Sequence, residues 1–185
     1  MPKIVQNGDP VLRKKAKAVL ISKITSTEIR DIITAMKKAL ATQKDGVAIA
    51  APQIGVSLRI FVVAGKIFEK DFERDIDAKK TSSKKEETKT KNPDLVFINP
   101  EIIKLSKKTS WLPEGCLSVR PLYGEVKRSL NATISAYDET GKKITRGAGG
   151  LLAHIFQHET DHLNGVLFID KARNVHEQIP EESLN

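Results

Sequence analysis

The sequence predicts an α+β fold, in which short antiparallel or mixed β-sheets pack around an α-helix near the carboxyl terminus. Three observations carry this prediction: an amphipathic helical pattern follows residue 25, several short β-branched runs occupy the middle of the chain, and an apolar helical segment spans residues 151–163. Strands and helices do not alternate regularly, as they would in a doubly wound parallel sheet. An α+β domain with one helix near each end is therefore expected.

The first helix is predicted from its start signal and its apolar spacing. Thr25-Ser26-Thr27-Glu28 has the form of a capping box. Apolar residues follow at helical spacing, namely Ile29, Ile32, Ile33, Met36 and Leu40. We expect the helix to end near Asp45 and Gly46.

Three strands are predicted from composition and alternation. Residues 58–63 (LRIFVV) and 95–98 (LVFI) are apolar and rich in β-branched side chains, as buried strands are. Residues 130–136 alternate apolar and polar side chains, which indicates a half-buried strand. Residues 138–141 (DETG) have turn chemistry.

The second helix is expected at residues 151–163. Gly149 and Gly150 precede it, and Asn164-Gly165 is a plausible carboxyl-terminal cap. The chain after Ala172 is polar and contains Pro180, so little core is expected there.

Length and charge predict a single domain over residues 1–185, with a flexible lysine-rich loop at about 66–93 and a polar tail from about 173. The formal net charge is +8. Residues 79–91 alone contain six lysines and two glutamates, and so carry half of that excess. Because this stretch lacks apolar side chains, we expect a solvated loop and no dedicated nucleic-acid site.

The single cysteine, Cys116, excludes an intrachain disulfide. The amino terminus has no apolar signal segment, and no stretch approaches the ~18 apolar residues of a membrane span. A cytoplasmic protein is expected, without membrane partners.

The segment His158-Glu159-Thr160-Asp161-His162 places two histidines four residues apart in the second helix. Side chains at this spacing share one helical face, about 6 Å apart along the axis, so both imidazoles can reach one ion. Glu159 points to the side of that face, where it can act as general base on a water. The surrounding helix is apolar, and polar groups in such a helix need partners. The segment therefore indicates metal-assisted hydrolysis.

A catalytic ion needs three protein ligands and one open position. The metzincin protease pattern would put a third histidine where this chain has Phe168. Glu177 lies in the polar tail, and His154 is about 12 Å along the helix axis from His162. None of these three is a good third ligand.

Cys116 is the better candidate for that ligand. Gly115 precedes it and lets the backbone approach an ion closely. A lone cysteine is equally often a small buried apolar residue, so the thiol alone does not decide the matter.

The chain resembles the peptide deformylase family. Three family motifs occur in the right order, as Gly46-Val47-Ala48-Ile49-Ala50-Ala51-Pro52-Gln53, Glu114-Gly115-Cys116-Leu117-Ser118 and His158-Glu159-Thr160-Asp161-His162. Weaker similarity covers most of the chain, including residues 9–13, 123–128 and 165–168. The loop from about 66 to 93 and the last residues are not covered.

The resemblance implies that Cys116, His158 and His162 bind one divalent metal ion. Fe²⁺ is the usual ion in the family, and Zn²⁺, Ni²⁺ or Co²⁺ can replace it. Ligand chemistry alone would favour zinc over ferrous iron.

The resemblance also implies the substrate, the N-formylmethionyl end of a newly made polypeptide, and the release of formate. Glu159 would accept the proton of the attacking water and then protonate the leaving amine. Charge on the formyl oxygen would be met by the Leu117 N–H and the Gln53 amide, as in other oxyanion sites. The ribosome, near its exit tunnel, is a possible partner.

Residues Gly46, Val47 and Ala48 would line the substrate, and two positions depart from the family pattern. Ala48 replaces a glycine, and its methyl group is expected to narrow the cleft or to exclude a positive φ. His154 replaces an apolar residue that faces the pocket; it is either a hydrogen-bonded histidine at the wall or a selector of the substrate side chain.

Four functions follow, in order of preference. The first is a deformylase, and the second is a metal-binding relative with altered or lost activity because of Ala48. The third is a zinc protease that cleaves unformylated peptides. The fourth is a basic RNA-binding module dependent on residues 79–91.

Overall fold

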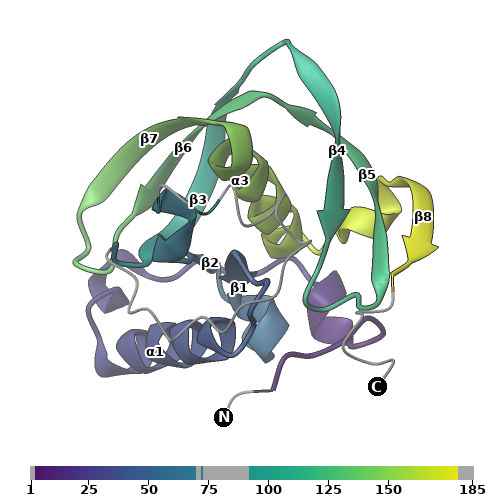
Figure 1. Cartoon of the computed structure of the whole chain (residues 1–185). Coiled ribbons are helices and arrows are strands. Elements are labelled where there is room, and N and C mark those ends of the chain that lie inside the picture. The colour runs from purple at the N-terminus through teal and green to yellow at the C-terminus, as the bar shows by residue number, and fades with distance from the viewer. Residues whose placement is uncertain (1–2, 70–71, 73–91, 179–185) are drawn as a thin grey trace.

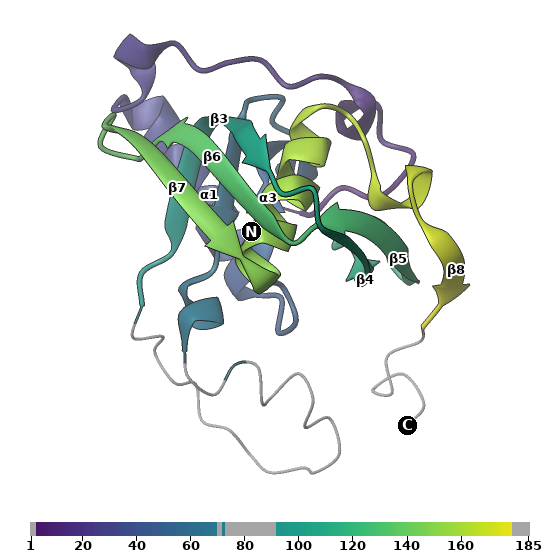
Figure 2. The ribbon, with the colours of Figure 1, turned by 90° about the horizontal axis from the view of Figure 1, so that it is seen from above.

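In the computed structural model, two antiparallel sheets enclose the helix α3 (Gly150–Leu163), and the helix α1 (Thr27–Ala41) covers the opposite face of the larger sheet (Figure 1). Figure 2 shows α3 between the two sheets. The structure describes residues 3–69, 72 and 92–178. The α+β prediction, with its amino-terminal and carboxyl-terminal helices, is confirmed.

The larger sheet has five strands in the order β1 (Ala48–Ala50), β2 (Ile60–Val63), β3 (Leu95–Leu105), β6 (Asn131–Tyr137) and β7 (Lys143–Gly149). The smaller sheet has β4 (Thr109–Gly115), β5 (Leu122–Ser129) and β8 (Arg173–Glu177) in that order. Every pair of neighbours in these two sheets is antiparallel. The strands β1 and β4 are edge strands, and this matters for the site.

Strand alternation divides the core between the two helices. Ile60 and Val62 of β2 face α1, whereas Phe61 and Val63 face α3. Phe61 stacks on Phe97 with ring centroids 4.8 Å apart, and Phe97 meets Phe156 of α3 edge-on at 5.2 Å. These aromatic contacts fix the position of α3 on the sheet.

The first helix begins and ends differently from the prediction. Ser26, not Thr25, is its N-cap, and the Ser26 hydroxyl accepts a hydrogen bond from the Ile29 N–H at 3.4 Å. The helix ends at Ala41, before the predicted end near Asp45. The second helix ends as predicted, with Asn164 as C-cap and Gly165 at φ 75°.

Strand β3 is longer than the predicted residues 95–98. It continues through Asn99 and Pro100 to Leu105, and the register shifts between Ile98 and Glu101. Asn99 has a φ of 50°, and its side chain exchanges hydrogen bonds with the backbone of Val19. This irregularity ends the apolar run without ending the strand.

The predicted loop and tail are only partly described. Residues 65–68 of the predicted loop region form a 3₁₀ helix, and residues 73–91 lie outside the described part of the chain. The polar tail contains β8, whose five residues are all exposed and pair with β5. The tail is thus ordered as a strand but adds no buried side chain over residues 173–177.

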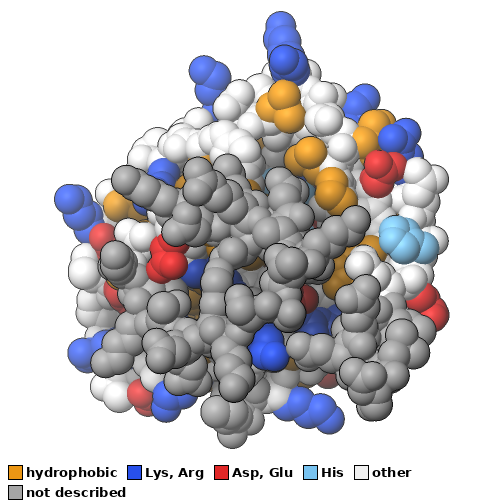
Figure 3. Space-filling model, in the orientation of Figure 1, with side chains coloured by type: hydrophobic (Ala, Val, Ile, Leu, Met, Phe, Trp, Pro, Cys, Tyr) orange, Lys and Arg blue, Asp and Glu red, His pale blue; other side chains and the backbone are white. Residues whose placement is uncertain are grey.

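No helix within the described ranges is long and apolar enough to cross a membrane. On the face in Figure 3, the visible Lys and Arg side chains lie mostly apart from one another around its edge.

Candidate active site

Helix α3 presents His158 and His162 on one face. Their rings lie 5.0 Å apart, edge to face. His162 is buried, and His158 is largely buried. The apolar residues Phe156 and Leu163 on the same helix are fully buried in the core, and this burial fixes the position of the helix that carries the two rings.

Cys116 follows directly on edge strand β4. Its Sγ lies 3.1 Å from His162 Nε2, and the ligand atoms of Cys116, His158 and His162 all lie within 4.8 Å of one another. Gly115 beside it leaves room for the Tyr123 ring, because a Cβ there would lie 2.5 Å from a ring carbon of Tyr123 and the ring would have to move. The close packing of β4 on β5 therefore places the thiol against the histidines.

Glu114, two residues before Cys116, fixes the orientation of His158. Its Oε2 is 2.9 Å from His158 Nδ1. Burial raises the pKa of the Glu114 carboxyl, but hydrogen bonds from His154, His158 and Arg128 outweigh it and hold the pKa well below its usual range. The carboxylate can then only accept, so His158 donates through Nδ1–H and turns Nε2 toward Cys116.

A buried ion-pair network anchors Glu114. Arg128 of β5 donates from Nε to Glu114 Oε1 at 2.6 Å and from Nη2 to Oε2 at 3.1 Å. Arg128 Nη1 also donates to Asp161 of α3 at 2.6 Å, and Lys171 donates to the other oxygen of Asp161 at 2.7 Å. The network ties α3 to both β4 and β5.

The three side chains fit a transition-metal ion by donor chemistry. Burial raises the pKa of the Cys116 thiol, but the adjacent His162 and His158 outweigh it and lower the pKa to about 5. A thiolate and two imidazoles are a donor set for a divalent transition metal, and three protein ligands leave a position for water. Cys116, His158 and His162 could therefore hold such an ion.

Glu159 lies beside this cluster with a buried carboxylate. Its Oε2 has no hydrogen-bond partner among the described residues. Burial raises the pKa of the Glu159 carboxyl, more than His158 and His162 lower it. A buried carboxylate oxygen without a protein partner suits an exchangeable proton on a water or substrate.

Gln53 is buried on the opposite side of Cys116. Its Oε1 accepts from the Ala50 N–H at 2.8 Å, which fixes the amide so that Nε2 is the outward end. Nε2 lies 3.2 Å from Ser118 Oγ and 3.5 Å from Cys116 Sγ. This donor is directed at the space beside the thiol.

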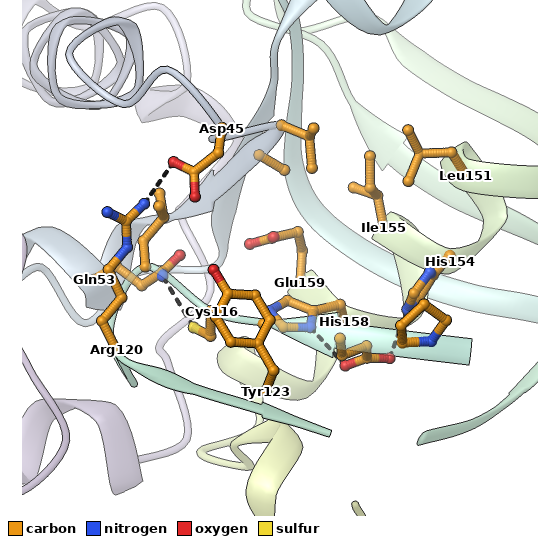
Figure 4. Close-up of a pocket in the computed structure, with 16 residues that line it drawn as sticks. Asp45, Gln53, Cys116, Arg120, Tyr123, Leu151, His154, Ile155, His158 and Glu159 are labelled. Carbon is orange, nitrogen blue, oxygen red and sulfur yellow. Dashed lines mark hydrogen bonds and ion pairs between the residues drawn. The ribbon is translucent and has the colours of Figure 1, made fainter. Parts of the chain in front are cut away.

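A cavity of about 230 Å³ opens onto these groups. Its lining is made of the edge strands β1 and β4, the segment after β4, and helix α3; it includes Val47, Ala48, Gln53, Leu117, Leu151, His154, Ile155, His158 and Glu159. Figure 4 shows Glu159 pointing into the space between Cys116 and Ile155. Gly46, also predicted from the sequence, is not among the lining residues.

Ala48 does not have the backbone conformation that its replacement of a glycine suggested. It lies in β1, paired with Val63, and is not among the described residues with positive φ. Ala48 is 6% exposed and lines the cavity. The prediction that the Ala48 methyl group excludes a needed positive φ is therefore wrong. The prediction that this methyl group narrows the cleft remains.

The rim contains residues that the sequence did not single out. Asp45 and Arg120 form an ion pair of 2.6 Å and both line the cavity, as does Tyr123 (Figure 4). Asp45 follows the first helix and Arg120 follows the Cys116 segment, so only the fold brings them together. No local pattern marks such a pair.

Comparison with known proteins decides the family. Residues 1–178 match the family model described as polypeptide deformylase. The chain belongs to the peptide deformylase family. The prediction of a deformylase is thereby confirmed at the level of family and enzyme class.

Relatives from distant sources support this assignment. The chain is 38% identical over 175 residues to peptide deformylase 1A, chloroplastic, of Solanum lycopersicum, covering 92% of this chain and 59% of that protein. It is 36% identical over 178 residues to peptide deformylase of Desulforudis audaxviator, covering 95% and 96%. The chain thus spans nearly the whole bacterial relative but about three-fifths of the plant one.

Solved deformylase structures share the fold. The Met-Ala-Ser-bound crystal structure of a class I type b peptide deformylase from Acinetobacter baumannii superposes with a TM-score of 0.73 at 28% identity, covering 91% of this chain and 97% of that one. The family removes N-formyl groups from nascent peptides and depends on a metal. The alternative of a relative with altered or lost activity receives no support from these comparisons.

Proposed function

We propose that this chain removes the formyl group from N-formylmethionyl ends of nascent polypeptides at the cavity between β1, β4 and α3. Cys116, His158 and His162 would hold one divalent ion, with Fe²⁺ expected and Zn²⁺, Ni²⁺ or Co²⁺ as replacements. The observation that carries the proposal is the meeting of these three ligand atoms beside the buried Glu159. When bound, the ion would supply Lewis acidity to water and to the formyl carbonyl.

Glu159 is the proton carrier in this proposal. Its unpartnered Oε2 accepts a proton from the attacking water, and the same oxygen then gives a proton to the leaving amine. The raised pKa of its carboxyl makes the protonated form easier to reach in the second step. One carboxylate can therefore serve both half-reactions.

Gln53 and Leu117 would stabilise charge on the formyl oxygen. The Gln53 amide is held by Ala50 and directs Nε2 toward the thiol. Leu117 follows Cys116 and lines the cavity, so its backbone N–H is a second donor candidate. Donors fixed before the reaction cost no reorganisation during it.

The two edge strands would bind the peptide chain. β1 and β4 each pair on one side only, and both contribute to the cavity wall, at Val47–Ala48 and Pro113–Gly115. An extended peptide can hydrogen-bond to such an edge as an added strand. The methionine side chain would enter between Leu151 and Ile155, and the Met-Ala-Ser bound by the Acinetobacter neighbour is consistent with a methionyl peptide here.

The proposed function also concerns the whole chain and its place in the cell. We infer a single catalytic domain over residues 1–185, a cytoplasmic location, and the ribosome near its exit tunnel as a partner.

Formate release from formyl-Met-Ala-Ser by the Co²⁺- or Ni²⁺-loaded protein tests the proposal. Acetyl-Met-Ala-Ser is the matched control, because it presents the same peptide with one extra methyl group. We expect formate from the first peptide and far slower acetate release from the second. No formate with iron, nickel or cobalt bound, or cleavage of unformylated peptide bonds instead, contradicts the proposal.

A further inference from the structure

His154 lines the cavity, but its ring nitrogen Nε2 is bonded to Glu114. It lies one helical turn before His158, and its Nε2 is 2.6 Å from Glu114 Oε1. The side chain is 14% exposed, and the Glu114 side chain is 2% exposed. In Figure 4 the dashed lines from His154 and His158 run to the same carboxylate.

The hydrogen bond from His154 completes the set of donors around Glu114. An ionised carboxylate has about four acceptor positions. Glu114 Oε1 accepts from Arg128 Nε and His154, and Oε2 accepts from Arg128 Nη2 and His158. Each oxygen therefore has two donors, and the carboxylate cannot rotate without losing one of them.

The two histidines must then have opposite tautomers when neutral. Because Glu114 only accepts, His154 donates through Nε2–H and His158 donates through Nδ1–H. The Nε2 of His158 thereby faces Cys116. Besides these two histidines of α3, Arg128 of β5 faces Glu114, and Asp161 lies beyond Arg128.

We propose that His154 is a positioning residue, which holds the Glu114 carboxylate on His158 and so fixes the ring and tautomer of that proposed metal ligand. The expected effects on metal binding and turnover rest on the proposed function, because His158 is a proposed ligand at that same site. It differs from a role in selecting the substrate side chain, because the one N–H of His154 is used by Glu114. Leu151 and Ile155 supply the apolar wall beside it.

Three variants separate positioning from substrate selection. His154→Leu removes the donor, His154→Gln keeps an N–H₂ at a similar reach, and Leu151→Ala changes the cavity wall one turn earlier on α3 without touching Glu114. The readouts are the Co²⁺ dissociation constant, followed by thiolate-to-cobalt absorption, the ¹⁵N chemical shifts of the histidines in the metal-free protein, and kcat and KM.

We expect His154→Leu to weaken Co²⁺ binding by about tenfold, the low end for partners outside the ligand shell. The ¹⁵N and ¹H shifts of the His158 Nδ1–H should change, because its acceptor Glu114 is no longer held by His154, and kcat should fall more than KM rises. His154→Gln should restore most of the affinity. Leu151→Ala should raise KM and leave the Co²⁺ dissociation constant unchanged.

Unchanged Co²⁺ affinity and unchanged His158 shifts in His154→Leu overturn the inference, as does a change of side-chain preference without a change of affinity. If that variant fails to fold, the ¹⁵N shifts of His154 in the unmodified protein still test the inference. They should show the Nε2–H tautomer, and an Nδ1–H tautomer would contradict the inference. If the unmodified protein binds cobalt but releases no formate, the proposed function fails and the affinity test still judges His154. If the unmodified protein binds no cobalt, the ¹⁵N shifts alone test the role of His154.

Discussion

The proposed proton transfer by Glu159 can be removed with little change in the shape of the side chain. Glu159→Gln keeps the volume of the side chain but cannot accept and return a proton. General acid–base catalysis typically contributes about 10²- to 10⁴-fold to a rate. We expect kcat for formate release to fall by about that factor while the bound metal content stays at the level of the unmodified protein.

The control for this prediction is Glu159→Asp, which retains the proton carrier but shortens its reach, and which should keep more activity than the glutamine variant. Equal activity of the glutamine variant and the unmodified protein would show that another group moves the proton.

Ala48 is expected to have a small effect on turnover. Its backbone is extended within β1, so only its methyl group differs from a glycine. We expect Ala48→Gly to change kcat/KM by less than about tenfold, or about 1.4 kcal/mol. The same variant should cost about 0.5–1 kcal/mol of unfolding free energy, because glycine weakens a strand. Steady-state kinetics and urea unfolding measure both, and a far larger gain in turnover would mean that the alanine suppresses the reaction.

The residues of the site were predictable from the sequence to very different degrees. His158, Glu159 and His162 form a local pattern, so their helical spacing alone brings them together. Arg128 and Asp161 are far from Glu114 in the sequence, and a buried arginine in a strand leaves no periodic signal. Only the packing of β4 and β5 on α3 shows that they support the same carboxylate.

A matched pair of variants can test which residue is the N-cap of helix α1. Ser26 caps the helix through the Ile29 N–H, whereas Thr25 lies one residue outside. We expect Ser26→Ala to cost about 0.5–1 kcal/mol of unfolding free energy. This is the low end for the loss of an N-cap, because the hydrogen bond from the Ile29 N–H to the Ser26 hydroxyl is long. Thr25→Ala should cost almost nothing. Urea unfolding of both variants measures the difference, and the reverse order would mean that the predicted capping box is the real one.

Strands were harder to predict than helices for identifiable reasons. The amphipathic spacing of α1 and the apolar length of α3 are strong signals, whereas β4 contains Pro113 and β7 contains Gly147 and Gly149. Proline and glycine argue against a strand interior. β1 is three residues of alanine and isoleucine, too short to show alternation. The edge strands that line the cavity were thus the elements least visible in the sequence.

The proposed metal centre joins the two sheets. Cys116 follows the smaller sheet, while His158 and His162 lie on α3, which packs against the larger one. A ligand that binds only the folded state stabilises it by an amount set by its concentration relative to its dissociation constant, about 2.7 kcal/mol at a hundredfold excess. We expect Co²⁺ or Zn²⁺ to raise the unfolding midpoint and a chelator to lower it, in one cooperative transition.

The control for this prediction is Cys116→Ala, whose unfolding midpoint should no longer respond to metal. A midpoint that shifts equally in that variant would place the stabilising ion elsewhere in the molecule.

The central claim is that one ion at Cys116, His158 and His162 supports deformylation. Its most direct test is to titrate metal-free protein with Co²⁺ and to follow formate release from formyl-Met-Ala-Ser at each addition. We predict no turnover without metal, a linear rise, and a sharp break at one ion per chain. Turnover in the metal-free protein, or none after one equivalent has bound, would contradict the claim.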